Sequence, residues 1–494
     1  MIFSILLFIS ILFLLRFNSF FRLKDCSSWT LSIAFFIKIS VAFLFYYIYV
    51  YNIGQNQAPS DAIRFMQESK MLFNVFTSSK SDYLSLLTGI GDNIEMHNSY
   101  MKESFIWDAG NFTFINDSRN TIRVHSLIQF ISHNQIVIHF ILINLIALVG
   151  VVQLFLSIRK FSTLNPHLLF YLLLLLPSLL FWSSSILKEP FLLFGVGLFM
   201  RGLLSNFSLS KKIVITIIGL LILIGFKPYI LICIVPAIIF YITFKYIFKF
   251  QLLKTFIFLF SILTLPLIIF PEKKQKLTEY ISRKQFDLEN VGEGGLHAYI
   301  NRDVNDGYYY FKPNQYQNIQ IIKDSVLLTK PSKAYFLSVD NKQIPKKVFI
   351  QPTGLKWKIH NIMPGTNSYF QSTLIDNSFK QLLLNIPEAI INAILRPFPF
   401  DTGSILKLPT MLEAWGVFLF LILSLIFKKK NIQKKEVGII LSLLIFATLL
   451  FLLIGWTTPI SGAIVRFRFP AQLAMVITAA ILIDYKRIKF WKNE

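Results

Sequence analysis

One acidic residue, Asp61, lies where a carboxylate could act as a general base. It occurs in the segment QAPSDAIRFMQESK, where an amphipathic pattern begins shortly after a long apolar run. A carboxylate there could take a proton from a hydroxyl group or hold a metal ion. The position also suits a helix N-cap, because Ser60 or Asp61 would accept hydrogen bonds at the start of a helix running through Met66 and Lys70. The sequence therefore leaves both roles open for Asp61.

Basic residues that could bind an anionic group lie at the ends of apolar runs. Charged groups at a membrane boundary are costly unless phosphate, carboxylate or headgroup oxygens meet them. The candidate substrate-binding residues are Lys188, Glu189, Lys227, Arg396, Arg466 and Arg468. In GAIVRFRFP the alternation puts both arginines on one face if the backbone is extended. Glu413 is a candidate counter-ion for one of these cations.

Several of these residues also have an ordinary structural explanation. In FWSSSILKEP, Ser184 or Ser185 could cap the next helix, while Glu189 would complement its dipole. Lys188, and likewise Lys227 in the turn GFKPY, could extend an ammonium group to the membrane surface. The two arginines of GAIVRFRFP could bind lipid headgroups in general.

A polar segment precedes the third apolar run. It reads WDAGNFTFINDSRNTIRVHSL and contains Asp108, Asp117, Arg119, Arg123 and His125. The spacing of Arg119 and Arg123 places both on one helical face. We expect a polar amphipathic helix that packs onto the membrane domain. His139, in the apolar run itself, is expected to be a hydrogen-bonded structural histidine.

Membrane helices must position these residues. The chain is 54% hydrophobic and 15% charged and contains 51 phenylalanines, whereas about a quarter of the residues in a typical globular domain are charged. Long apolar runs read as helices because hydrocarbon leaves backbone polar groups no other partner. The first run lacks a basic n-region and a cleavage site, so we expect it to be retained. The expected spans are 2–15, 29–51, 135–158, 168–182, 190–206, 213–226, 229–244, 254–270, 411–427, 437–455 and 469–484.

Lysines and arginines predict the orientation of these spans. They gather in every second connection, as in 16–24, 159–160, 211–212, 245–254 and 428–435, and in the C-terminal tail. The positive-inside rule then places the N-terminus outside and the C-terminus in the cytoplasm. The expected organisation is transmembrane helices 1–2 (1–51), extracytoplasmic loop 1 (52–134), helices 3–8 (135–270), extracytoplasmic loop 2 (271–405), and helices 9–11 with a basic tail (406–494).

The second loop contains its own pattern. Residues 334–340, 348–351 and 355–360 alternate like short strands, and residues 379–395 form an amphipathic pattern interrupted by Pro387. The glycines of VGEGGLH predict a loop. We therefore expect an all-α polytopic membrane protein of about eleven transmembrane helices. Its second extracytoplasmic loop would contain a small α+β or β subdomain and a helix lying on the membrane surface.

Other classes of protein are disfavoured. The formal net charge of +23 does not indicate nucleic-acid binding, because the basic residues gather at the ends of apolar runs. Membrane lipids are the expected partners instead. Cys26 and Cys233 have no metal-binding or disulfide spacing. A Gly-rich phosphate loop, an HExxH motif and a nucleophile elbow are all absent from the sequence.

Several segments resemble one family over nearly the whole chain. These are SDAIRF, NDSRNTIRVHSLIQFIS, PSLLFWSSSILKEP, KPY, RPFPFD with TMLEAW, and GAIVRFRFP. They resemble polytopic membrane proteins, chiefly from Bacteroidetes, some of which lie among genes for cell-surface polysaccharides. The architecture is similar to that of C-type glycosyltransferases, which place an acid where Asp61 lies, and of O-antigen-like polymerases, which use outer-face arginines that Arg466 and Arg468 match loosely. The paired Asp-Glu motif of many C-type enzymes is absent.

The resemblance implies a role in cell-surface polysaccharide assembly. A glycosyltransferase or polymerase would use a polyprenyl-phosphate-linked sugar at the outer face of the bacterial inner membrane. Asp61 would deprotonate the acceptor, and the cations would hold the carrier phosphate. No cofactor is evident; a divalent cation could assist, although the sequence has no metal-binding motif. Two alternatives stay open, a transporter of a lipid-linked or anionic solute and a non-catalytic membrane scaffold, although charges at one outer face favour a surface site over a transport pathway.

Overall fold

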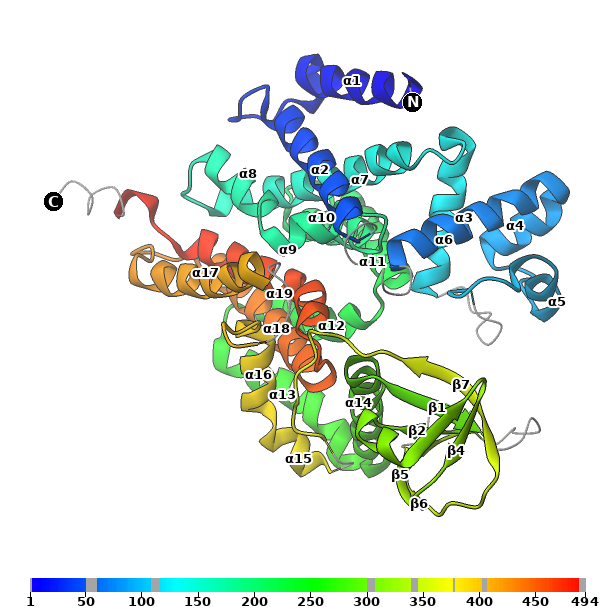
Figure 1. Cartoon of the computed structure of the whole chain (residues 1–494). Helices are drawn as coiled ribbons and strands as arrows, with labels where there is room; N and C mark the ends of the chain where they lie inside the picture. Colours follow the sequence, from blue (N-terminus) through cyan, green and yellow to red (C-terminus); the bar gives the residue numbers. More distant parts are fainter. Residues whose placement is uncertain are drawn as a thin grey trace. The chain divides into compact units, whose positions relative to one another are not determined.

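The computed structural model describes residues 2–49, 60–107, 116–299, 307–338, 345–375, 378–401 and 407–487. These residues are mostly helical, with one antiparallel sheet (Figure 1). Among them, eight helices are long and apolar enough to cross a membrane. They are α2 (Thr30–Tyr47), α7 (Ile136–Ile158), α11 (Leu209–Phe226), α12 (Tyr229–Ile242), α13 (Leu252–Ile269), α17 (Lys407–Ile426), α18 (Lys434–Thr457) and α19 (Ser461–Leu482).

The other three expected spans coincide with shorter helices. The first is α1 (Ile2–Phe17), and the fifth is α10 (Glu189–Leu204). The fourth is broken into α8 (Pro166–Leu174) and α9 (Pro177–Trp182), because Pro177 has no backbone N–H to continue the first helix. The structure thus supports a multi-pass helical membrane protein with eight candidate spans in its described residues, fewer than the eleven expected.

The chain divides into two compact units. The first contains residues 1–235, 420–440 and 475–494, and the second contains residues 236–419 and 441–474.

Glycines bring three helices of the first unit close together. A Cβ atom added to Gly197 of α10 would lie 2.3 Å from the backbone oxygen of Gly150 on α7. One added to Gly219 of α11 would lie 2.6 Å from the backbone nitrogen of Phe199 on α10. Small residues allow such backbone approach between membrane helices. The α7, α10 and α11 helices therefore form a tightly packed core.

The first loop folds into helices. They are α3 (Asp61–Ser78), α4 (Lys80–Thr88), the short α5 (Ile94–Met96) and α6 (Asp117–Ser132). Asn116 caps α6 by accepting hydrogen bonds from two backbone N–H groups, as Ser79 does once for α4. Phe130 of α6 packs against Phe73 and Phe76 of α3, with ring centroids 4.9 and 4.8 Å apart. The predicted amphipathic helix is confirmed, and α3 is its partner.

The second loop, in the second unit, begins with a helix that the sequence analysis did not predict. This is α14 (Pro271–Glu293), which follows α13 directly. Seven antiparallel strands follow in the order β3-β4-β7-β1-β2-β5-β6. They are β1 (Gly295–Tyr299), β2 (Tyr308–Phe311), β3 (Ile319–Ile322), β4 (Ser325–Leu328), β5 (Ser332–Leu337), β6 (Lys346–Ile350) and β7 (Lys356–Met363). The last three correspond to the predicted strands.

The two faces of the sheet have different partners. One face forms its own core, in which Leu296, Phe311 and Trp357 are buried. The other face packs against Phe286 of α14 through Tyr310 and Leu337. The glycines of VGEGGLH do not form a loop: Gly294 ends α14 with a φ of +82°, and the strand β1 starts at the next residue. A left-handed C-terminal glycine of this kind is favourable because it has no Cβ.

The amphipathic segment after the sheet forms two short helices. These are α15 (Phe379–Leu384) and α16 (Ile386–Leu395), and Pro387 lies in the first turn of α16. Proline is tolerated there because the first turn does not need its N–H group. The predicted helix is therefore present, divided just before the proline.

Candidate functional site

Asp61 is the first residue of α3, and its side chain is exposed. Ser60 occupies the N-cap position, but its side chain makes no capping hydrogen bond. The simple capping explanation therefore does not apply to Ser60. The dipole of α3 favours a carboxylate in the first helical turn, and Asp61 occupies that turn.

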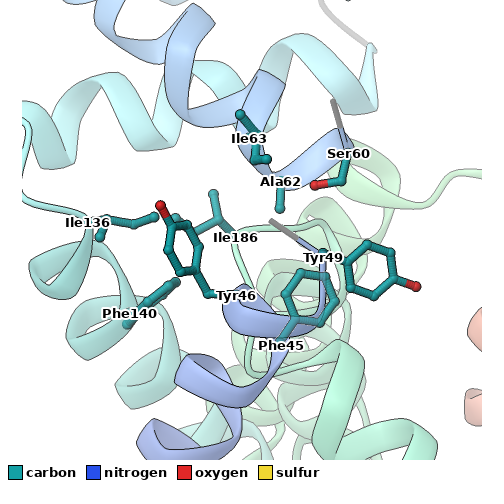
Figure 2. A pocket seen from close by; sticks show the side chains of 9 residues that line it. All are labelled: Phe45, Tyr46, Tyr49, Ser60, Ala62, Ile63, Ile136, Phe140 and Ile186. Atoms are coloured by element: carbon teal, nitrogen blue, oxygen red, sulfur yellow. The ribbon is translucent and has the colours of Figure 1, made fainter. Parts of the chain in front are cut away.

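A small, partly open pocket lies at the start of α3. Its α3 side is formed by Ser60, Ala62 and Ile63, which flank Asp61 in the chain (Figure 2). The rest of the lining is apolar or aromatic and comes from the end of α2, the start of α7 and the segment before α10: Phe45, Tyr46, Tyr49, Ile136, Phe140 and Ile186. The rings of Phe45 and Tyr49 stack with centroids 4.5 Å apart. Such a surface suits a hydrocarbon chain.

Lys188 lies between α3 and the start of α6. Its Nζ atom is 2.7 Å from a carboxylate oxygen of Asp117 and donates a hydrogen bond of 2.8 Å to Ser118. It also lies 5.9 Å from the ring centroid of Phe65. Because Phe65 is four residues after Asp61 on α3, the two share a helical face. The structure thus brings Asp61 and Lys188 to the same end of α3.

Glu189 and Lys227 form a second, buried ion pair. Their charged atoms are 3.1 Å apart, and the side chain of Glu189 is fully buried. Nearby, Asn120 of α6 donates a hydrogen bond of 2.9 Å to the carbonyl of Gly225 on α11. The ion pair joins the start of α10 to the end of α11, and the hydrogen bond joins α6 to the same end of α11. The geometry gives Glu189 and Lys227 a positioning role.

The sequence analysis missed the partner of Arg119 and Arg123. Both guanidinium groups face Asp92, at 2.6 and 3.6 Å, and both lie over the Trp107 ring. Burial lowers the pKa of Arg123 to about 10, so it stays charged at neutral pH. The spacing of the arginines indicated a shared face, but Asp92 in the turn GDN gave no signal of its own. Asp108 lies outside the described residues.

The His139 prediction is confirmed. Its Nδ1 atom is 2.9 Å from Nδ1 of His125, and its Nε2 atom is 2.9 Å from the Ser132 hydroxyl. Both histidines are fully buried. These contacts join α6 to α7 rather than opening to a ligand.

The candidate arginines belong to the second unit. Arg468 is fully buried and donates to the carbonyls of Ala393, Ile394 and Arg396 at the end of α16, and to that of Thr410 in α17. Arg396 pairs with Asp401 at 2.6 Å and lies over the Phe370 ring at 3.6 Å. Arg468 thus binds protein carbonyls.

Arg466 and Arg468 do not share a face. The segment is helical from Ser461 onward, and residues two apart in a helix point in different directions. The condition under which they would share a face, an extended backbone, is therefore not met. Gln472 lies between Arg468 and Glu413. With its amide oxygen toward Arg468 it would accept from Nε at 3.2 Å, and its amide nitrogen would then donate to Glu413 at 3.3 Å. One amide would thus link Glu413 to the predicted cation.

Within the described ranges, no three histidine, cysteine, aspartate or glutamate side chains are grouped so that they could hold a metal ion. Comparison of the chain with protein-family models, with curated proteins and with solved structures found no match.

Proposed function

We propose that the protein acts in cell-surface polysaccharide assembly, on a polyprenyl-phosphate-linked sugar at the outer face of the bacterial inner membrane. The observation that carries this proposal is that Asp61 and Lys188 lie at the same end of α3, where Ser60, Ala62 and Ile63 line an apolar pocket. Such a substrate has three parts, a hydrocarbon chain, a phosphate and a sugar. The pocket would take the chain, Lys188 the phosphate, and Asp61 the acceptor hydroxyl.

The contact between Lys188 and Asp117 supports the phosphate assignment. A carboxylate oxygen at 2.7 Å marks a position where an anionic oxygen is stable beside the ammonium group. The Asp117 side chain is 32% exposed, so it could turn toward solvent when a phosphate oxygen replaces it. Binding would then exchange one anion for another around the same cation.

The reaction would be an inverting glycosyl transfer. Asp61 takes the proton of the acceptor hydroxyl as that oxygen forms a bond to the anomeric carbon. The bond between this carbon and the phosphate oxygen breaks, and its electron pair leaves with the polyprenyl phosphate group. Lys188 offsets the negative charge that develops on the leaving oxygen. A divalent cation bound with the phosphate would serve the same purpose.

Glycan production in a bacterial host tests the proposal. We expect Asp61→Asn and Lys188→Gln to abolish surface glycan and to raise the level of the lipid-linked precursor. Asp82→Asn and Lys80→Gln are matched controls, because Asp82 also lies in a first helical turn and Lys80 also lies over a phenylalanine ring, 5.8 Å from Phe76. Normal glycan in both site variants at normal protein levels would sink the proposal.

One observation favours transport of a lipid-linked or anionic solute as a second candidate. Lys38, near the middle of α2, is fully buried and donates to the carbonyl and hydroxyl of Ser183 and to the hydroxyl of Ser184. These serines follow α9, where the helical path is interrupted before α10. Ionisable groups beside broken helices are common in transporters.

Proteoliposomes separate the two candidates. A transporter should move a fluorescent polyprenyl phosphate across the bilayer with no sugar acceptor present, should keep this activity in Asp61→Asn, and should lose it in Lys38→Gln. The enzyme should show no such movement. Glycan synthesis that survives Asp61→Asn, together with lipid movement lost in Lys38→Gln, would select the transporter.

A further inference from the structure

The second unit contains a face on which aromatic rings and lysines lie side by side. On β7, Trp357 points into the core of the sheet, so Lys356 and Lys358 on either side point to the opposite face. The register places Lys358 opposite Tyr299 of β1. We call Tyr299, Tyr308, His360, Lys356 and Lys358 the basic-aromatic face.

The rings of this face form one continuous group. His360 lies 5.3 Å from Tyr308 and 6.4 Å from Tyr299 between ring centroids. A β-bulge between β1 and β7 accounts for the position of His360. The bulge leaves His360 as an extra residue between the β7 partners of Ala298 and His297. His360 is exposed and the two tyrosines are half-buried. Their ring surfaces are held in place yet reachable from solvent.

The surrounding charge is positive. Residues 295–363 contain ten lysines and arginines, four aspartates and no glutamate, a formal charge of +6. Two acidic groups of α14 have basic partners: Asp287 is 2.8 Å from Arg283, and Glu289 is 3.0 Å from Lys312. Among the described residues of the sheet, Asp324 adjoins the face, because its backbone carbonyl accepts a hydrogen bond from the N–H group of Ile359. Lys356 is exposed and Lys358 is half-buried. An anion that approaches Lys356 and Lys358 would thus meet a segment with an excess of positive charge.

We propose that the basic-aromatic face binds an anionic glycan chain. The carbon-bound hydrogens of a sugar ring pack well on an aromatic face, and tyrosine offers a large contact area at low entropic cost. The ammonium groups of Lys356 and Lys358 bind the carboxylate, phosphate or sulfate groups of acidic sugars. A neutral glycan would use the rings but not the lysines, and an anionic lipid surface would use the lysines but not the rings.

This proposal uses the orientation assumed in the proposed function, in which the sheet lies outside the cell. Single-stranded nucleic acid also combines ring stacking with phosphate charge, but it is not expected on that side. The glycan bound here would be the growing or finished polymer. The face would hold it near the membrane surface independently of any chemistry at Asp61.

Binding by the purified full-length protein in detergent tests the proposal. The probe is an oligogalacturonate of about ten sugars, compared with a neutral maltooligosaccharide of the same length. We expect the acidic probe to bind at least tenfold more tightly than the neutral one, and we expect its affinity to fall as the salt concentration rises. The double variant Lys356→Gln/Lys358→Gln should bind the acidic probe about tenfold more weakly, the sum of two charge contacts at the surface. His360→Ala should weaken the binding of both probes.

The matched control is Lys346→Gln with Lys347→Gln. These two substitutions remove the same amount of charge from β6, which lies four strands from β7 in the same sheet. We expect at most a twofold effect from this pair. Equal losses from the two lysine pairs would show a diffuse charge effect and would overturn the site. Binding of an oligothymidylate as tight as that of the acidic probe would also overturn the site. So would a Lys356→Gln/Lys358→Gln variant that loses only its binding to anionic-lipid vesicles.

The Asp61→Asn variant separates this inference from the proposed function. It should bind the acidic probe as wild type does, because it leaves the basic-aromatic face unchanged. Loss of glycan in Asp61→Asn with normal probe binding in Lys356→Gln/Lys358→Gln would overturn this inference alone. Normal glycan in Asp61→Asn with the expected probe binding would overturn only the proposed chemistry.

Discussion

The ammonium group of Lys188 lies 2.7 Å from the carboxylate of Asp117 and joins the start of α10 to the start of α6. The pair is partly exposed, with 13% of the Lys188 side chain and 32% of the Asp117 side chain accessible. Partly exposed pairs contribute little to stability, about 1 kcal/mol or less. Lys188 is therefore available to exchange its partner.

Substitution on the two sides of this pair should have unequal effects. In Lys188→Gln we expect the KM for a polyprenyl-phosphate-linked sugar to rise at least tenfold, because the phosphate loses its cation. In Asp117→Asn the lysine keeps its charge, and KM should stay the same or fall. Steady-state kinetics with purified protein makes the comparison. If both variants raise KM equally, the pair is purely structural.

Glu68 should be important for the fold of the first loop. Its buried carboxylate accepts hydrogen bonds from the backbone N–H groups of Phe105, Ile106 and Trp107 and from the Ser104 hydroxyl. Glu68→Gln replaces one acceptor oxygen by a donor, so we expect a loss of about 2 kcal/mol in the free energy of unfolding. Thermal unfolding in detergent measures it, and exposed Glu95→Gln is the control. An unchanged midpoint would contradict the assignment.

The contact between α7 and α10 should tolerate no added methyl group at Gly197. A Cβ there would lie 2.3 Å from a backbone oxygen, so we expect Gly197→Ala to lower stability by about 2 to 3 kcal/mol. Gly416 of α17 has no heavy atom within 4 Å of its added Cβ, and Gly416→Ala should be neutral or stabilise by up to about 1 kcal/mol. Melting temperatures of the two variants provide the test. Similar values would refute the close packing.

Replacement by lysine should lower stability at Arg468 but not at Arg466. Arg468→Lys keeps the charge but loses the fork that reaches carbonyls on α16 and α17, so we expect about 2 kcal/mol less stability. Arg466, half-buried two residues earlier, should tolerate lysine with little change in melting temperature. Limited proteolysis near α16 gives a second readout, because Arg468→Lys should increase cleavage there. Equal destabilisation by the two substitutions would argue against this difference.

Acidification should destabilise the sheet through His297. Burial, with a smaller effect of His360, lowers the pKa of His297 to about 4, below the value of about 6.5 in an unfolded chain. The stability from the neutral ring is complete above pH 6.5 and is lost as the pH falls toward 4, by about 2 kcal/mol at pH 5. His297→Phe should therefore show a smaller drop in melting temperature between pH 7.5 and pH 5 than wild type. An equal drop would contradict the prediction.

Local pattern predicted the helices well and the sheet in part. Every expected span coincides with one or two helices, because an apolar run of this length can satisfy its backbone only internally. Strands β1 to β4 were missed: Tyr308–Phe311 and Ser325–Leu328 are only four residues long, and each has one neighbouring strand, β5 or β7, that lies far along the chain. The charged helix α14 was also missed, because its apolar contacts become evident only once Phe286 meets the sheet.

The sequence by itself determined that this is a multi-pass helical membrane protein and which residue types lie at the ends of its helices. Hydropathy is a sum over neighbouring residues, so it can be read from the linear sequence without knowledge of the tertiary structure. Only the tertiary structure decided the partners of the charged residues: Arg119 meets Asp92 27 positions away, and Lys188 meets Ser118 70 positions away. Such pairs depend on how helices pack, and packing contacts between distant segments leave no local pattern in the chain.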